Sequence, residues 1–377
     1  GGLSTTLGRT KVTCVEGLCV GGASETNAGL YHPPPAEILD GWAQRYQIED
    51  FGAAAMEEHL QAMQALVPIS KHPDGPSTIS RRLEHGASKL GWNSVELPRF
   101  WKYQRQADGS LLGARQSMTQ SLIPRATSAG CRLLSESRVV RLLGENGRFS
   151  MAEITQRGPE GVQPLWVNFN TVFVCAGAIQ TALLLRRSGI SHHIGNTLTL
   201  NPMIRILARF NDPVNDPTRG VPVQQVEAFK PAMTLGCSHS SPAHLALWLT
   251  GDPARRARLL QSWRHLAILY VKIAPSGRGS VRNIPWFDQS LLRFPVGPSE
   301  YSLLSIGLER LGQLAFACGA VEVFHPISGA PSVTRVADAA QLGMGIGPGN
   351  VALSAIHLHS TVPMGGVASS AADSYGC

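Results

Sequence analysis

Two histidines near the end of the chain precede a turn of small residues: His357 and His359 in the stretch 355–365, AIHLHSTVPMG. A neutral imidazole, with an ordinary pKa of about 6.5, can accept a proton at neutral pH. Two imidazoles this close could also hold a metal, but the sequence shows no cluster that would supply a third ligand. We therefore interpret His357 as a proton acceptor and predict no metal site.

A glycine-rich stretch near the start of the chain could approach a ligand closely. Residues 20–29 read VGGASETNAG, with Gly21 and Gly22 side by side. Glycine lets the backbone come near a phosphate or a flat ring system. Asn27 would add a side-chain amide, and Ala28 and Gly29 would add backbone donors. Taken alone, the pair of glycines is more typical of a hairpin turn.

A third segment has the pattern strand, tight turn, helix. Residues 167–174 alternate and then become continuously apolar, as in a buried strand. Ala176-Gly177-Ala178 follows, and then an apolar helix that Gly189 would end. This arrangement presents backbone N–H groups to a phosphate. The small residues could equally serve close packing of helix on strand.

Together these segments resemble the glucose–methanol–choline (GMC) family of flavin oxidoreductases, over nearly all of the chain. Residues 17–29 are similar to its GG-S-S-x-x-N signature, and residues 174–190 are similar to its second signature. Residues 357–365 resemble its H-x-x-x-T-x-x-M-G turn. Residues 373–376 resemble the start of the segment that returns to the cofactor.

The resemblance implies FAD as the cofactor and oxidation of a small-molecule alcohol by hydride transfer to the flavin. His357 would be the base or the hydrogen-bond partner of the hydroxyl. The segments are nearest to choline-dehydrogenase-like and long-chain-alcohol-oxidising members, and the electron acceptor could be O₂ or another compound. The implied cofactor contacts are Gly21, Gly22, Ser24, Asn27, Ala28, Gly29, Val139, Ala176, Gly177 and Ala178. Val139 would meet the adenine, although a plain core valine is nearly as well supported.

The chain also departs from the family pattern. It has no G-x-G-x-x-G turn, and the second catalytic position, His or Asn, would lie beyond residue 377. Both ends resemble cuts through a larger protein, so we expect this polypeptide to bind FAD poorly or not at all, to be inactive and to aggregate. The alternatives are an inactive fragment and a redox-inactive lyase of the same family. A serine hydrolase is weaker still, because residues 236–240, GCSHS, do not form a G-x-S-x-G turn.

The predicted fold class is α/β: an incomplete FAD-binding doubly wound domain interleaved with an α+β substrate domain whose sheet is mostly antiparallel. Residues 1–31 and 131–200 would belong to the FAD-binding part, 32–130 to a helical insertion, 201–352 to the substrate domain, and 353–377 to the start of a C-terminal segment. Periodicity predicts helices at 53–67, 79–90, 118–129, 253–266 and 299–318. It predicts strands at 133–134, 139–140, 167–174, 204–210, 267–273 and 321–324, with a hairpin in 147–164.

Composition indicates an ordinary globular protein. Of 377 residues, 43% are hydrophobic and 16% charged, which argues against disorder. No apolar run approaches the roughly 20 residues of a membrane span. The net charge is +7, but no aromatic residues interleave with the arginine clusters, so we predict no nucleic-acid partner. Seven cysteines without a CxxC pair are typical of buried, reduced thiols and a cytoplasmic protein.

Overall fold

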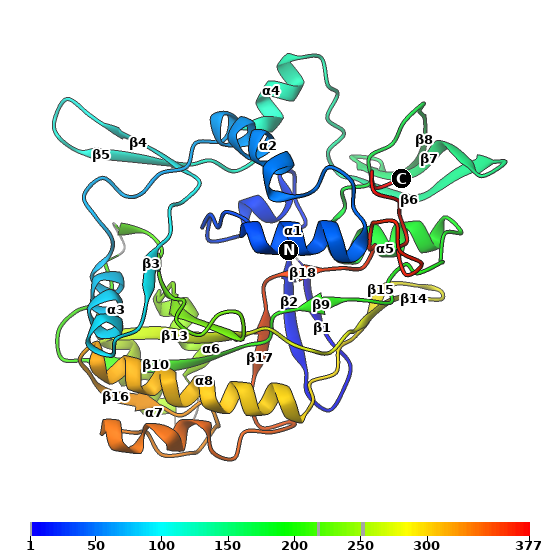
Figure 1. Ribbon diagram of the computed structural model, residues 1–377. Coiled ribbons are helices and arrows are strands. Elements are labelled where there is room, and N and C mark those ends of the chain that lie inside the picture. Colours follow the sequence, from blue (N-terminus) through cyan, green and yellow to red (C-terminus); the bar gives the residue numbers. More distant parts are fainter. Residues whose placement is uncertain (1, 217–218, 250–252) are drawn as a thin grey trace.

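The computed structural model describes residues 2–216, 219–249 and 253–377. Within these residues nine strands form one mixed sheet, which runs across the centre of Figure 1. The parallel pairing in it is between β2 and β17, and the other neighbours are antiparallel. The order is β1 (Gly2–Thr5), β2 (Val12–Glu16), β17 (Leu353–Ala355), β10 (Met203–Phe210), β13 (Leu266–Ile273), β12 (Met233–Ser238), β11 (Gln224–Val226) and β3 (Ser94–Glu96), with β16 (Ala320–Phe324) also on β10.

One face of this sheet packs against helices to form the main hydrophobic core. Ile204 on β10 lies opposite Val271 on β13, which lies opposite Leu235 on β12, and all three are buried. Two helices cover this face: α8 (Pro298–Ala317), along the bottom of Figure 1, and α3 (Thr78–Lys89). Alternate residues of the same strands point to the opposite face, because side chains in a strand alternate. That second face carries a smaller apolar cluster around Leu207 and Ile268, and polar residues further along the same strands.

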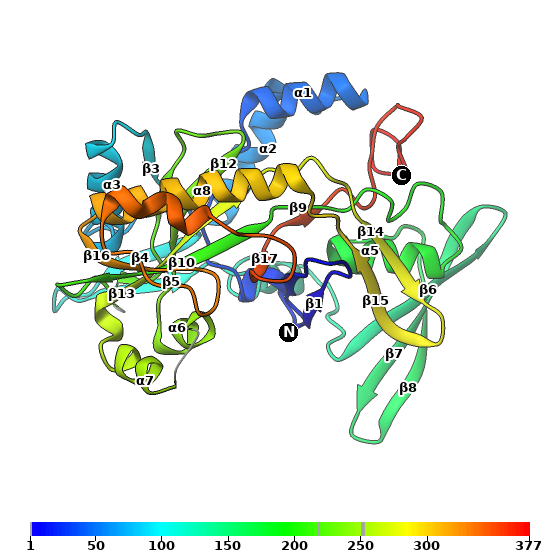
Figure 2. The ribbon, with the colours of Figure 1, turned by 90° about the horizontal axis from the view of Figure 1, so that it is seen from below.

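Smaller units surround the sheet. The turned view of Figure 2 shows β6 (Ser137–Glu145), β7 (Arg148–Gly158) and β8 (Gly161–Asn168) extending from one side as a separate antiparallel sheet. Helix α5 (Gly177–Arg187) lies between it and the hairpin of β14 (Ser280–Ile284) and β15 (Phe287–Arg293). The remaining elements are α1 (Ala36–Tyr46), α2 (Ala53–Leu66), β4 (Trp101–Arg105), β5 (Leu111–Arg115), α4 (Leu122–Ser128), β9 (Thr199–Leu200), α6 (Pro242–Trp248), α7 (Pro253–Gln261), β18 (Leu358–His359) and the 3₁₀ helices η1 (Gly22–Glu25), η3 (Trp263–His265) and η4 (Val336–Gly343).

The predicted helices and most of the predicted strands are confirmed. α2, α3 and α8 begin and end within a residue of the predicted bounds, as do β10, β13 and β16. The hairpin predicted within 147–164 is β7 and β8. Helix α4 is shorter than predicted, and the helix predicted over 253–266 is divided into α7 and η3.

The buried strand predicted at 167–174 is wrong. β8 ends at Asn168, and residues 169–175 form no strand. The side chain of Phe173 is 86% exposed, and Cys175 is exposed rather than buried. The apolar pattern predicted burial, but a buried strand also needs neighbours to bond its backbone. After the bond from the N–H of Phe169 to the carbonyl of Ser150, none of the strands described here bonds residues 170–175. The strand predicted at 133–134 is also wrong, because residues 131–134 form neither a helix nor a strand.

Packing of α8 on the sheet depends on a helical residue without a side chain. A Cβ on Gly307 would lie 2.6 Å from Cγ2 of Val271, whose branched side chain cannot move aside. We expect Gly307→Leu to lower the free energy of unfolding by about 3 kcal/mol through overpacking. Urea unfolding followed by circular dichroism measures this change.

Gly41 in α1 provides the matched control. It is exposed, and a Cβ there would meet nothing within 4 Å. Gly41→Leu should therefore raise the free energy of unfolding by about 0.5–1 kcal/mol, because leucine favours a helix more than glycine does. Equal effects of the two substitutions would contradict this account of the packing of α8.

Candidate active site

The glycine-rich stretch after β2 forms a tight turn. Gly21 has φ 85° and Gly22 has φ 57°, both in the left-handed region that favours glycine, and η1 follows. A Cβ on Gly22 would meet nothing within 4 Å, so the backbone there borders open space. Ser24 fixes the turn from inside: its Oγ donates to the carbonyl of Gly21 at 2.7 Å. The turn therefore leaves room for a flat or phosphorylated ligand against Gly22.

Arg115, at the end of β5, closes this turn from outside. Its Nη2 donates to the carbonyls of Ser24, at 2.7 Å, and of Asn27. The same nitrogen also reaches Oδ1 of Asn27. A guanidinium can satisfy several acceptors at once because its donors are fixed in one plane. Arg115 was not among the predicted site residues, because nothing in the sequence links it to a turn some 90 residues away.

The donors predicted for residues 27–29 are only partly available. Oδ1 of Asn27 accepts from the backbone N–H of Gly29 at 2.8 Å, so that N–H is already used. The carbonyl of Gly29 accepts from the N–H of Phe100 at 2.8 Å. Among the hydrogen bonds of the described residues, the amide nitrogen of Asn27 has no acceptor, so it can donate to a ligand. Ala28 beside it is exposed.

The second predicted turn starts helix α5. Gly177 has φ 82°, and Ala176 N–H donates to Oγ1 of Thr181 at 3.1 Å. The N–H groups of Gly177 and Ala178 lie in the first turn of the helix, where no carbonyl of the helix can accept them. The positive end of the helix dipole is also at this position. The turn can therefore bind an anionic or hydroxyl group through two backbone donors.

Three of the predicted segments meet at this turn. The hydroxyl of Thr361 donates to the carbonyl of Ala178 at 2.6 Å, which attaches the histidine-bearing turn to α5. A carboxylate oxygen of Glu16, at the end of β2, is 3.8 Å from the position of a Cβ on Gly177. Strands β2 and β17 pair in parallel, so the Gly21 and His357 segments leave the sheet at the same edge.

Val139 lies apart from this meeting point. It packs in a small core with Leu142, Ala152 and Ile154. Its strand, β6, is attached to the other end of α5, where Oγ of Ser188 accepts from the N–H of Leu142 at 2.8 Å. The contact between Val139 and an adenine stays a prediction.

His357 is exposed, but protein atoms crowd its ring. This crowding, followed by the positive charges of Lys272, His32 and His359, lowers the pKa of His357 to about 4. The imidazole is therefore neutral at pH 7 and can accept a proton. His32 directly follows the Gly21 segment. Sequence reasoning missed His32 and Lys272, because neither stands in a recognisable motif.

His359 lies in a different setting. It is in the short strand β18, opposite Thr199 of β9, and its Nδ1 is 3.1 Å from Oγ of Ser360. A bend at residue 356 precedes His357, so the two histidines do not belong to one regular strand. The coordinates of residues 2–216, 219–249 and 253–377 contain no group of three His, Cys, Asp or Glu residues arranged to hold a metal.

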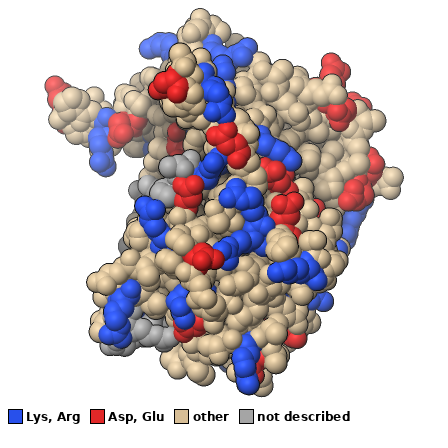
Figure 3. Space-filling view, turned by 90° about the vertical axis from the view of Figure 1, so that its left-hand side faces the viewer, with Lys and Arg blue, Asp and Glu red and all other residues tan. Residues whose placement is uncertain are grey.

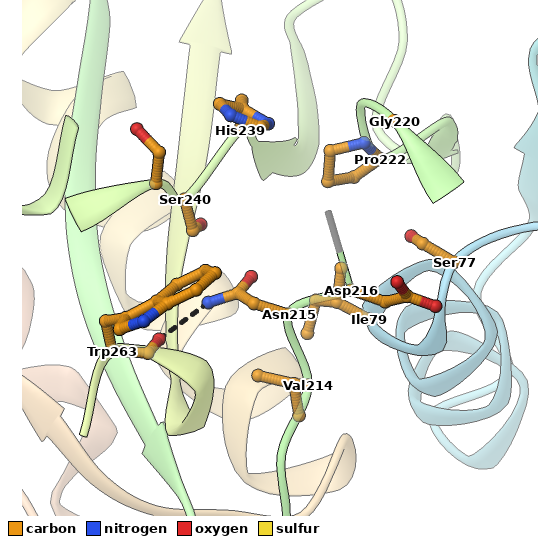
Figure 4. Close-up of a pocket in the computed structure, with 11 residues that line it drawn as sticks. Ser77, Ile79, Val214, Asn215, Asp216, Gly220, Pro222, His239, Ser240 and Trp263 are labelled. Atoms are coloured by element: carbon orange, nitrogen blue, oxygen red, sulfur yellow. Dashed lines mark hydrogen bonds between the residues drawn. The ribbon is translucent and has the colours of Figure 1, made fainter. Parts of the chain in front are cut away.

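A cavity of about 60 Å³ lies elsewhere, below the start of α3 (Figure 4). The labelled side chains of Trp263, Asn215, His239 and Ser240 surround it, and none of the candidate site residues lines it. Oγ of Ser240 donates to the carbonyl of Ser238 at 3.1 Å and accepts from the N–H of Ile268 at 2.9 Å. The hydroxyl is thus occupied by the backbone of the sheet.

Comparison with known proteins identifies the family. The GMC oxidoreductase family model matches residues 1–203. The uncharacterized GMC-type oxidoreductase y4nJ of Sinorhizobium fredii is 35% identical over the whole of this chain and 76% of its own length. The long-chain-alcohol oxidase FAO4A of Arabidopsis thaliana is 21% identical over 86% of this chain, which spans 47% of that relative.

Solved structures share the fold at low identity. A formate oxidase of Aspergillus oryzae has a TM-score of 0.71 at 12% identity, over 96% of this chain and 78% of its own. An FAD-dependent oxidoreductase from Chaetomium thermophilum has a TM-score of 0.63 at 14% identity, over 97% and 80%. Both confirm the predicted α/β class, with mostly antiparallel sheets.

The chain therefore has the fold of FAD-dependent oxidoreductases, and it belongs to the GMC oxidoreductase family. The cofactor of this family is FAD. In the described part of the chain no helix has the length and apolar content that crossing a bilayer requires.

The closure of the turn by Arg115 can be tested without a ligand. We expect Arg115→Met to speed amide hydrogen exchange of residues 24–29 by about tenfold or more, because several charge-assisted bonds are lost. Arg105→Met is the matched control: Arg105 lies on the same hairpin, but it donates to the carbonyl of Gly109 at 3.0 Å and to Asp74 instead. Unchanged exchange in Arg115→Met would show that residues 24–29 keep their conformation without the bonds from Arg115.

The charge environment of His357 gives a second test. Removing the positive charge of Lys272 should raise the pKa of His357, because the imidazolium is no longer repelled. The pKa should stay below 6.5, since crowding of the ring remains. Histidine ring signals followed by NMR from pH 4 to 8 measure this in Lys272→Met. Lys102→Met, on the exposed surface of β4, should leave the titration of His357 unchanged.

Proposed function

We propose that this protein oxidises an alcohol and that His357 accepts the proton of its hydroxyl group. One observation carries the proposal: the parallel pairing of β17 with β2 makes the His357 and Gly21 segments leave the sheet at one edge, and the bond from Thr361 to Ala178 attaches the first of them to α5. The lowered pKa of His357 supports it, because the imidazole is then neutral at pH 7. The relative that is named as a long-chain-alcohol oxidase supports an alcohol as the substrate class.

The residues around the turns fit FAD, and we propose that they hold it although the chain lacks the G-x-G-x-x-G turn from which weak binding was expected. Gly22 borders open space, and Asn27 has an amide nitrogen available to donate. Gly177 and Ala178 add two helix N-terminal donors. The full proposed set is Gly21, Gly22, Ser24, Asn27, Ala28, Gly29, Ala176, Gly177 and Ala178, with Val139 toward the adenine. Bound FAD supplies the acceptor for the hydride.

Each protein group then has a limited task. His357 receives the hydroxyl proton on a ring nitrogen while the carbinol hydrogen leaves as hydride. Such a base contributes about 10²–10⁴ in rate. We further propose that residues 1–31 and 131–200 build the cofactor part and that residues 201–352 build the substrate part. The sheet face that carries Lys272 would then border the substrate.

His357→Gln tests the assignment of the base. Glutamine keeps a hydrogen-bonding side chain but cannot take a proton at neutral pH, so flavin reduction by an alcohol should slow by about 10²–10⁴. The flavin absorbance spectrum should be unchanged. The measurement is anaerobic bleaching of the flavin in the FAD-loaded protein.

His359→Gln is the control, because His359 lies two residues further on and contacts Ser360. It should change the rate far less than His357→Gln. A wild-type rate in His357→Gln would remove the proton-acceptor role while leaving the flavin chemistry in place. Cleavage of the alcohol without bleaching would identify the redox-inactive lyase instead.

A further inference from the structure

Lys272 lies on the face of the large sheet that is opposite to the face covered by α8. In the antiparallel ladder it lies opposite Met203 on β10 and opposite Thr234 on β12. Met203 in turn lies opposite Ser354 on β17, three residues before His357. Directly paired residues share a face, so Lys272 and Ser354 lie on the same side of the sheet, separated by one strand.

The ammonium group of Lys272 is mostly surrounded by protein. Among the described residues it makes no salt bridge and no hydrogen bond. The carboxylate whose charge reaches it is Glu227, and this carboxylate already pairs with Lys230 at 2.7 Å. Crowding by protein, followed by the charge of Lys230, lowers the pKa of Lys272. An unpaired charge in such a place is costly, so its presence needs a reason beyond stability.

The positive charge also lies close to the candidate base. Of the charges that lower the pKa of His357 and of His32, that of Lys272 has the largest effect. Arg205 adds a second cation on the same sheet face, opposite Tyr270 and bonded to Oγ of Ser354. By contrast, the outer surface in Figure 3 intersperses basic and acidic side chains, as solvated faces do.

We propose that the substrate of this site is an alcohol that also carries an anionic group, in the simplest case a carboxylate, and that Lys272 binds this group. The inference rests on the proposed function, because it names the substrate class of the same site. The anion would supply the missing counter-ion, and the hydroxyl would extend toward His357. A quaternary ammonium alcohol would be repelled by the same charge, which disfavours the choline-like substrates suggested by the sequence.

Three four-carbon alcohols that differ in terminal charge test the proposal: 4-hydroxybutyrate, 1,4-butanediol and 4-amino-1-butanol. Each is mixed anaerobically with the FAD-loaded protein, and kcat/KM for flavin bleaching is compared. A charge-assisted contact predicts that the carboxylate is preferred over the diol by about 10- to 100-fold, with the amine slowest. Equal or faster bleaching by the diol or the amine would overturn the proposal.

Variants show whether Lys272 causes the preference. In Lys272→Met the ratio between carboxylate and diol should fall to about one, whereas Lys272→Arg, which keeps the charge, and Lys102→Met, which removes a distant one, should retain it. An unchanged ratio in Lys272→Met would overturn the assignment of Lys272.

A binding measurement separates this proposal from the proposed function. Butyrate cannot be oxidised at a hydroxyl, but it should shift the NMR signals of the His357 ring, and it should bind at least about tenfold more weakly to Lys272→Met. If none of the alcohols bleaches the flavin but butyrate binds in a way that depends on Lys272, the proposed alcohol oxidation is refuted and the anion site remains. Bleaching without binding of butyrate would refute the anion site alone.

Discussion

The parallel pairing of β2 with β17 is the constraint on which the candidate site depends. It joins residues near the start of the chain to residues near its end, Cys14 opposite Ala355. Because both strands run in the same direction, the segments that follow them emerge at one edge of the sheet. One of these segments carries Gly21 and the other carries His357. Without this pairing, neither the turn nor the imidazole would have a fixed position relative to the other.

Side-chain bonds then set the finer geometry. Thr361 attaches the histidine turn to the carbonyl of Ala178, and Arg115 closes the turn around Asn27. Arg115 comes from outside the segment that it closes, whereas Thr361 belongs to the histidine turn and bonds to another segment. Glycine loses much conformational entropy when its backbone is fixed, and the hydrogen bonds of the anchors offset part of this cost. A flexible sequence is thereby held in one shape before any ligand arrives.

Elements and residues that depend on local sequence could be predicted, whereas those that depend on partners far along the chain could not. Helix α8 and strand β10 could be predicted from the local sequence, because the spacing of apolar residues in each is sufficient to indicate the element. Residues 167–174 have the pattern of a buried strand, yet the strand ends at Asn168 and no described strand bonds the backbone of residues 170–174. The motif residues Gly21, Gly177 and His357 could be selected by type and spacing. Arg115 and Lys272 could not, since their roles arise from a hairpin crossing and from strand register.

The combination of a base with a nearby cation has a consequence for catalysis. While Lys272 is unpaired, its charge disfavours the imidazolium form of His357 and so weakens the base. An anionic group bound to Lys272 would cancel part of this effect, and the pKa of His357 would rise when a substrate is present. Displacement of water by the substrate acts in the opposite direction, so the ion pair must offset that loss of solvation. A site of this kind strengthens its proton acceptor for substrates of the matching charge, which gives selectivity in the chemical step as well as in binding.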